Sequence, residues 1–230
     1  MTPVVLTTKA GRCAIVPTAT LEEYLESIYK LAEHGVVRPT QLAESMGVSG
    51  PTVTATLHRL ESHGLVTRAG RSVELTDEGR TRALDIIRRH RLAERFLVDA
   101  LGMDWEEAHE DACLLEHALS PRVLSALETF LNNPDVCPHG HPIPGADGTV
   151  RVITGVLLSD ASAGSTVRVL RVREDDELLG YIGELGLKPG AMVKVVEAAP
   201  FGGPLTVTVS GATTAISREV GSRVTVEVAP

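Results

Sequence analysis

Imidazole, thiolate and carboxylate side chains concentrate in residues 90–117. His90 and Glu94 are one helical turn apart, at the spacing i, i+4. Such groups, projecting from neighbouring helices, are the usual ligands of transition metals. The stretch therefore predicts a metal site, and no other part of the sequence concentrates chemistry in this way. Four of its residues share the spacing i, i+4, i+7, i+8 of a single helix face: His109, Cys113, Glu116 and His117.

Length and composition indicate a soluble globular protein of one large domain or two to three small ones. Hydrophobic residues make up 43% of the 230 residues, but aromatic residues only 3%, so the cores must be aliphatic. Three cysteines form an odd and sparse set. This usage does not suggest a disulfide framework and fits a reducing cytosol, so we expect a cytoplasmic protein.

Apolar runs in the sequence are all shorter than the ~20 residues that span a bilayer, so no membrane partner is expected. Residues 1–19 are predicted to form a tail rather than a signal peptide. With a net charge of −8, the protein as a whole does not attract nucleic acid electrostatically. A local basic surface is compatible with that total.

The N-terminal third has the pattern of a helix-turn-helix. Thr20 and Glu23 have capping-box spacing and predict the start of a first helix, which is followed by a short helix over 40–46. A Gly turn then leads to a third helix, with Ser49 as its N-cap and Pro51 in its first turn. The alternative interpretation is an ordinary helical hairpin that does not bind DNA.

Two short alternating strands, at 65–68 and 72–76, follow the third helix directly and predict a wing. A winged helix-turn-helix binds DNA with the first turns of its third helix, through contacts to phosphates and base edges. Thr and Pro carbons can touch thymine methyl groups, and arginines can contact phosphates. The candidate DNA-binding residues are Ser49, Pro51, Thr52, Thr54, Arg59, Arg68 and Arg71.

Three further helices are predicted, a long one from Thr76 towards Leu101, one over 105–119 and one over 121–131. Residues 132–148 have no helical period and are interpreted as a linker. Cys137, His139 and His141 lie in this segment, and we favour loop residues over metal ligands there.

The C-terminal part changes to short alternating strands, interrupted by one helix over 176–185, which predicts a small β-barrel. We therefore expect a multidomain protein, mainly α with a small β domain. The predicted boundaries are a tail at 1–19, a winged helix-turn-helix at 20–84, a helical domain with the metal-ligand candidates at 85–145, a linker at 146–154 and a β domain at 155–230.

This order of parts resembles the diphtheria toxin repressor family, which includes the iron-dependent regulators. The resemblance is carried by R-H-R-L-A-E-R-F-L at 89–97, H-E-D-A-C-L-L-E-H at 109–117 and H-P-I-P-G at 141–145, between a winged helix and a β domain. It implies a metal-dependent transcriptional repressor with an SH3-like C-terminal domain.

The resemblance also implies two metal sites. The ancillary site would take an acidic group from 174–177 of the C-terminal domain, with Asp175 the first choice. Glu23 has a second explanation, as the Glu of the capping box. By position, the primary ligands would be Glu23, Cys113, Glu116 and His117, and the ancillary ligands His90, Glu94, His109 and Asp175.

The metal ligands mix two types within that family. Iron-type members have Met where this chain has Glu23, whereas manganese-type members have an acidic residue there and tend to have Glu in place of Cys113. A thiolate favours softer metals, so we expect iron(II) first and manganese(II) second, with cobalt(II), nickel(II) or zinc(II) as surrogates. Ala55 stands where family members often have Gln, which leaves more of the recognition to DNA shape.

The sequence thus predicts a homodimeric, metal-activated repressor of metal-homeostasis genes that binds a palindromic double-stranded operator. We expect it to be no enzyme and to take no small organic substrate. One metal ion would join the DNA-binding and dimerisation domains. Two alternatives stay open: a metalloenzyme with a non-haem metal site, and a winged-helix regulator that senses thiol oxidation through Cys113.

Overall fold

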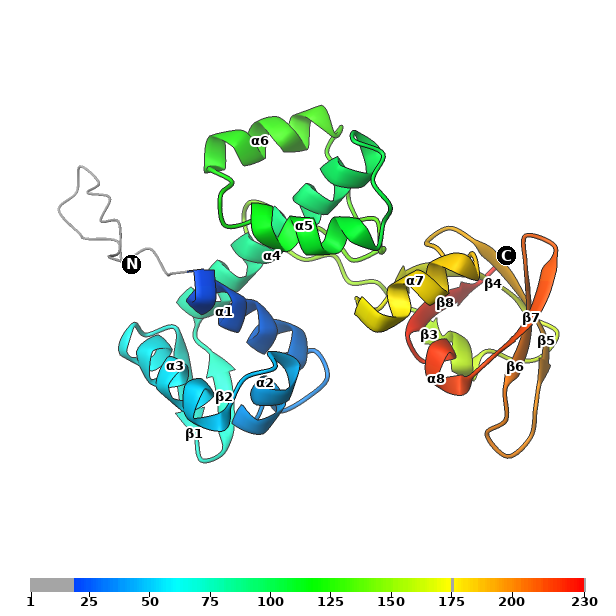
Figure 1. Cartoon of the computed structure of the whole chain (residues 1–230), viewed down its shortest axis with the longest axis horizontal. Helices are drawn as coiled ribbons and strands as arrows, with labels where there is room; N and C mark the ends of the chain where they lie inside the picture. The colour runs from blue at the N-terminus through cyan, green and yellow to red at the C-terminus, as the bar shows by residue number, and fades with distance from the viewer. Residues whose placement is uncertain (1–18, 175, 230) are drawn as a thin grey trace. The chain divides into compact units, whose positions relative to one another are not determined.

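The computed structural model describes residues 19–174 and 176–229 (Figure 1). These residues form two compact units. The first contains residues up to Arg88 together with Ala146–Gly148, and the second contains Arg89–Gly145 and the chain from Thr149 on. No helix within the described residues is long and apolar enough to cross a membrane.

The first unit has the winged helix-turn-helix arrangement that the sequence predicts. Val66 pairs with Leu75 and Ala69 with Ser72, so Gly70, at φ +63°, and its neighbour form a two-residue turn at the tip of the wing. The core is mainly aliphatic, as the composition predicts, but it also contains Tyr24 and Tyr29 of the first helix. The elements are α1 (Ala19–Ala32), α2 (Pro39–Ser45), α3 (Gly50–Ser62), β1 (Val66–Ala69) and β2 (Ser72–Leu75).

Local capping explains where α3 begins, and it corrects one prediction for α1. The Ser49 hydroxyl accepts a hydrogen bond from the Thr52 backbone N–H at 3.4 Å, so Ser49 is the N-cap as predicted. Helix α1 already includes Ala19, so Thr20 lies inside the helix and the predicted capping box is wrong. Glu23 consequently loses its structural explanation as a capping residue.

A close backbone contact fixes the start of α4 (Asp77–Asp99) against the end of α3. The Thr76 hydroxyl accepts from the Gly79 N–H at 3.0 Å and donates to the Gly64 carbonyl at 2.7 Å. A Cβ atom on Gly79 would lie only 1.9 Å from the Leu65 carbonyl oxygen. Gly79 is therefore required by backbone packing.

We expect Gly79→Ala to lower the free energy of unfolding by about 3 kcal/mol, because backbone must move to admit the methyl group. Gly50→Ala is the matched control, since a Cβ there meets nothing within 4 Å and its change should stabilise the helix by about 0.5–1 kcal/mol. Urea unfolding followed by circular dichroism measures both. Equal stability of the two variants would contradict the prediction.

The helices of the second unit are shorter than the sequence suggested. Helix α5 (Glu107–Leu115) ends before Glu116, whose backbone is still right-handed helical, and helix α6 (Pro121–Phe130) starts at the N-cap Ser120. Glu116 and His117 therefore lie in the turn that follows α5. The predicted helix over 105–119 was too long at both ends.

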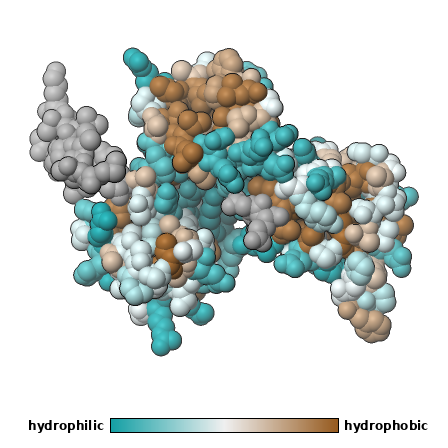
Figure 2. Space-filling view, in the orientation of Figure 1, coloured by the Kyte–Doolittle hydropathy of each residue, from teal (hydrophilic) through white to brown (hydrophobic). Residues whose placement is uncertain are grey.

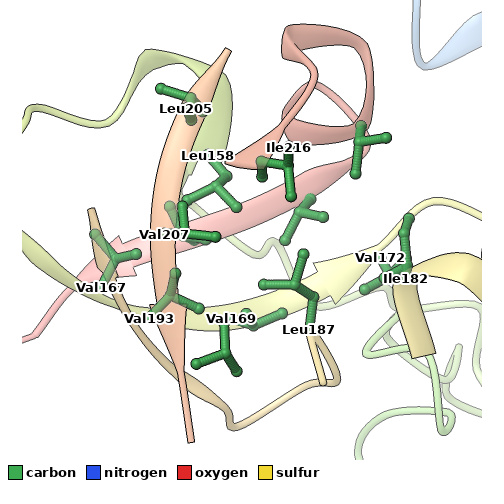
Figure 3. Close-up of a cluster of buried hydrophobic side chains, with 14 of the residues drawn as sticks. Leu158, Val167, Val169, Val172, Ile182, Leu187, Val193, Leu205, Val207 and Ile216 are labelled. Carbon is green, nitrogen blue, oxygen red and sulfur yellow. The ribbon is translucent and has the colours of Figure 1, made fainter. Parts of the chain in front are cut away.

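The C-terminal part is a six-stranded antiparallel sheet in the order β3-β8-β4-β5-β6-β7, with α7 (Asp176–Glu184), α8 (Arg218–Gly221) and the short 3₁₀ helix η1 (Leu158–Asp160). Figure 3 shows its core, in which side chains from the alternate positions of several strands point inward. The strands are β3 (Val156–Leu157), β4 (Thr166–Val172), β5 (Met192–Ala198), β6 (Leu205–Val209), β7 (Ala212–Ile216) and β8 (Val224–Val228).

Residues 132–145 are packed, contrary to their interpretation as a linker. Cys137 N–H donates to the His141 carbonyl at 2.8 Å and Gly140 N–H donates to the Cys137 carbonyl at 2.9 Å, which closes a tight turn. The Cys137 and His139 side chains are buried. A Cβ on Gly140 would lie 2.1 Å from the Leu170 carbonyl oxygen, so this turn sits directly against β4.

Candidate metal centre and DNA-binding surface

One fully buried carboxylate, Glu94 on α4, lies at the centre of the metal-ligand candidates. Its Oε1 is 2.9 Å from His90 Nε2, 2.8 Å from His109 Nδ1 and 3.3 Å from His139 Nδ1. Its Oε2 is buried and has no hydrogen-bond partner among the described residues. A buried acceptor atom without a partner is costly, and a bound cation would satisfy it.

The donor atoms of His90, Glu94 and His109 form a nearly regular triangle. The third edge, from His90 Nε2 to His109 Nδ1, is 3.2 Å. Neighbouring ligands in an octahedron with bonds of about 2.1 Å are about 3.0 Å apart. The triangle therefore matches one face of an octahedral site, and two imidazoles with one carboxylate are a known face for iron(II).

His90 also connects this triangle to the ligands after α5. Its other nitrogen, Nδ1, is 2.7 Å from Glu116 Oε2 and 3.9 Å from Cys113 Sγ. The second Glu116 oxygen is 3.3 Å from His117 Nε2. The structure thus brings the helical ligand candidates together in one network, with His90 between two buried carboxylates.

His90 and Glu94, two buried members of that network, shift each other's pKa. Burial opposes the charged ring of His90, but the Glu94 charge and hydrogen bonds from Cys113, Glu116 and Glu94 raise its pKa well above the usual range. Burial likewise opposes the Glu94 carboxylate, but His90 and hydrogen bonds with His109 and His139 hold its pKa well below normal. Without metal, a proton on the His90 ring offsets part of the buried negative charge.

A second group of possible ligands shares Glu94 and includes Cys137 and His139, which the sequence predicts to be loop residues. One ligand atom each from Glu94, Cys137, His139 and Glu174 lies within 4.8 Å of the others. Cys137 Sγ is 3.8 Å from Glu174 Oε1, and His141 Nε2 is 3.9 Å from the same oxygen. The C-x-H spacing of Cys137 and His139 was the available signal for this group. The Pro and Gly content of the segment led instead to its interpretation as a linker.

The environment of this group differs from residue to residue. Burial, followed by the charges of Glu94 and Glu174, raises the pKa of the Cys137 thiol well above normal. Burial lowers the pKa of His141 to about 4, so this ring is neutral and is held by the Val172 carbonyl at 2.8 Å. Burial also disfavours the charge of His139, yet Glu94 raises its pKa. His139 is therefore the more strongly engaged of the two histidines.

Trp105 packs against His139 and fixes its ring. The ring centroids are 4.8 Å apart, and His139 Nε2 is 3.0 Å from the Trp105 carbonyl oxygen, so Nδ1 is the atom that faces Glu94. Trp105 belongs to the apolar core of the β domain, where a Cβ on Gly183 of α7 would lie 2.6 Å from its Nε1. The β domain is thereby packed against the ligand turn.

The two remaining predicted ligands are Asp175 and Glu23. Asp175 lies outside the described residues, and the carboxylate found beside the ligand group is that of its neighbour Glu174. Glu23 belongs to α1 of the first unit, whereas the other described ligand candidates belong to the second unit.

The predicted DNA-binding residues lie on α3 and the wing. The hydroxyls of Ser49 and Thr52 are 2.8 Å apart, and Thr54 donates to the Gly50 carbonyl at 3.0 Å. Pro51 is exposed within the first turn. Arg59, on α3, and Arg71, at the tip of the wing, are both exposed, as phosphate contacts require. Arg68 is already paired, because its Nε and Nη2 lie 3.1 and 2.5 Å from Glu61 Oε2.

Family models match three consecutive segments of the chain: an iron dependent repressor N-terminal DNA binding domain at residues 18–72, an iron dependent repressor metal binding and dimerisation domain at 76–145, and a FeoA domain at 156–228. The chain belongs to the iron-dependent repressor family. It is accordingly a metal-dependent transcriptional repressor with an SH3-like C-terminal domain, as the sequence predicted.

Relatives of this repressor extend over most of its length. It is 41% identical over 210 residues to the iron-dependent repressor IdeR of Mycobacterium tuberculosis strain H37Rv, with 84% of this chain and 89% of the relative covered. It is 35% identical to the diphtheria toxin repressor of Corynebacterium diphtheriae, with 77% and 84% covered. A solved manganese-dependent transcriptional repressor complex with manganese matches at a TM-score of 0.84 and 35% identity, covering 91% of this chain and 100% of that one.

Proposed function

We propose that this repressor binds a palindromic operator as a homodimer when iron(II), or less effectively manganese(II), occupies its metal sites, and that it controls genes of metal homeostasis. The observation that carries the metal dependence is the buried Glu94, with three imidazole nitrogens within 3.3 Å of one oxygen and no partner for the other. The chain acts in the cytoplasm, where bacterial operator DNA is found.

The primary ion is held by Cys113, Glu116 and His117, with Glu23 as a fourth ligand. Support comes from their order and spacing in the sequence and from the contact of Glu116 with His117 at 3.3 Å. A histidine that binds a metal through one nitrogen commonly donates the other N–H to a carboxylate. His90 can serve an ancillary ion with Nε2 while its Nδ1–H donates to Glu116, which would couple the two sites.

The ancillary centre is built around Glu94 and takes ligands from both groups that share this carboxylate. His90 and His109 complete the octahedral face described above, and Cys137, His139 and Glu174 supply a thiolate, an imidazole and a carboxylate from other segments. Glu174 would be an acidic contribution from the C-terminal domain, next in the chain to Asp175, which lies outside the described residues. Loss of the thiol and imidazole protons would accompany metal binding.

Metal choice follows from the donor atoms. Thiolates at Cys113 and Cys137 favour softer ions such as iron(II) and zinc(II), whereas carboxylates suit manganese(II). We expect operator binding by the unchanged protein to require less iron(II) than manganese(II), and Glu23→Met to widen that difference by about tenfold. Anaerobic titration of each ion, read by fluorescence anisotropy of a labelled operator, measures this.

Two results of that titration would contradict the proposal. Operator binding in excess chelator that equals binding with metal would remove the metal dependence altogether. An unchanged iron-to-manganese ratio in Glu23→Met would remove Glu23 from the primary site. Glu22→Met, a change on the same helix turn, is the control for a general effect of removing a carboxylate. By linkage, operator DNA must tighten metal binding by the same factor as metal tightens DNA binding.

The two thiols can be assigned separately with cobalt(II), whose bonds to thiolate give intense near-ultraviolet charge-transfer absorption. We expect Cys137→Ser and Cys113→Ser each to remove part of this absorption, and the double variant to remove it all. Each serine keeps a small polar side chain, so the fold should persist. Full absorption in Cys137→Ser would exclude Cys137 from the centre.

A further inference from the structure

The outward face of α3 is defined by the residues that it buries. Val53, Thr56, Leu57 and Leu60 are the buried residues of the helix. Successive residues of a helix are 100° apart around its axis. The side of α3 opposite these four buried residues therefore carries residues at the spacing i, i+4, i+7 and i+11, starting in the first turn. His58 is the large side chain among them, and its side chain is 80% exposed. The four residues of this face are Pro51, Ala55, His58 and Ser62.

The other polar groups at the start of α3 are engaged within the helix. Ser49 accepts the Thr52 N–H and lies 2.8 Å from the Thr52 hydroxyl, and Thr54 donates to the Gly50 carbonyl. Ala55 offers no polar atom. His58 is thus a polar group at the middle of the outward face with a ring nitrogen left for another molecule.

Arg68 and Glu61 set the orientation and the tautomer of the His58 ring. Arg68 Nη2 is 3.4 Å from His58 Nδ1, and since a guanidinium only donates, Nδ1 must accept. The proton of the neutral ring is then on Nε2. Glu61 Oε2, 3.6 Å from Nδ1, would instead stabilise the doubly protonated ring. Nε2 carries a hydrogen in both cases, so His58 presents a donor.

Arg68 is itself neutralised in this arrangement. Two of its nitrogens contact Glu61 Oε2, and this hydrogen bond, ahead of the Arg68 charge, lowers the pKa of Glu61. A guanidinium that already has a carboxylate partner gains little from a phosphate. In this arrangement, Arg68 therefore acts as a positioning residue for His58.

We propose that His58 is a specificity-determining residue, which donates its Nε2–H to a guanine in the major groove of each operator half-site. Of the major-groove edges, guanine presents two adjacent acceptors, N7 and O6, whereas adenine places a donor beside N7 and thymine a methyl group beside O4. The inference rests on the DNA-binding function of the winged helix. In this proposal the His58 contact takes the place of a contact from residue 55, because Ala55 has no long side chain on the same face.

Selection of duplexes from a randomised pool tests this, with the full chain saturated with manganese(II). We expect the unchanged protein to select a guanine at one position per half-site, and His58→Ala to lose that preference together with about tenfold in affinity for the selected duplex. Binding to unrelated duplex should stay the same. His63→Ala is the matched control, because His63 is exposed at the end of the same helix but 140° away around it.

The dependence of affinity on salt separates a base contact from a phosphate contact. His58→Ala should leave the slope of log affinity against log salt unchanged, whereas loss of a phosphate contact lowers it by about one. Arg68→Ala should weaken the guanine preference, also without changing the slope.

An unchanged base preference in His58→Ala, or a slope reduced by about one, would overturn the proposal. Failure of the unchanged protein to bind any duplex with metal would instead count against the proposed metal-dependent function. Both variants are at exposed positions, and circular dichroism confirms that each is folded.

Discussion

Replacing Glu94 by Gln should abolish metal binding at the ancillary centre while ions bound by Cys113, Glu116 and His117 remain. The amide keeps the shape but removes the charge on which three imidazoles converge, so we expect affinity at this centre to fall by about 100-fold or more. Equilibrium dialysis with manganese(II), followed by elemental analysis, measures bound metal per chain.

The matched control for this prediction is Glu110→Gln, which removes an exposed carboxylate from α5. Loss of a buried charge from a paired network also destabilises the metal-free protein, by about 3–5 kcal/mol. Glu94→Asp therefore serves as a second variant, which keeps the charge but shortens the side chain. Metal content of folded Glu94→Gln equal to that of Glu110→Gln would refute the central role of Glu94.

Phe130→Glu should convert the dimer into monomers and abolish tight operator binding. Phe130 is 68% exposed on α6, in edge contact with Phe96, and Figure 2 shows apolar side chains gathered over that helix. We propose this face, with Leu114 and Val123, as the dimer interface. Burying an unpaired carboxylate there should raise the dimer dissociation constant by about 100-fold or more.

Sedimentation velocity reports the oligomeric state, and anisotropy with the palindromic operator reports DNA binding. Phe201→Glu is a control of the same chemistry, since Phe201 is fully exposed at the turn between β5 and β6. A dimer that survives Phe130→Glu would place the interface elsewhere. Affinity for a single half-site should be nearly unchanged, because each recognition helix remains intact.

The helical and strand elements could be predicted because their signals are local. Ser49 at the N-cap, Gly70 in the wing turn and the alternation of valines along β4 each act within a few residues. The end of α5 was missed for a related reason. Boundaries depend on packing against distant segments, and the i, i+8 pattern continues through Glu116 and His117 although the helix has ended.

The same distinction between local and long-range signals applies to the ligands of the candidate metal site. His90, Glu94 and His109 could be found from the sequence because helical periodicity places them on facing surfaces. Cys137 and His139 could not, because the turn that contains them is held by β4 and by Trp105, both far away in the chain. Nothing local in the sequence reveals the pairing of Arg68 with Glu61, seven residues earlier, so the ion pair could not be predicted.

The contact of Trp105 with His139 has an optical consequence. The chain contains one tryptophan, so its intrinsic fluorescence arises from a ring 4.8 Å from a ligand candidate of the ancillary centre. A paramagnetic ion bound there would quench that emission, whereas a diamagnetic ion such as zinc(II) would mainly shift it. The protein thus carries a built-in, label-free probe that can follow filling of this centre in real time.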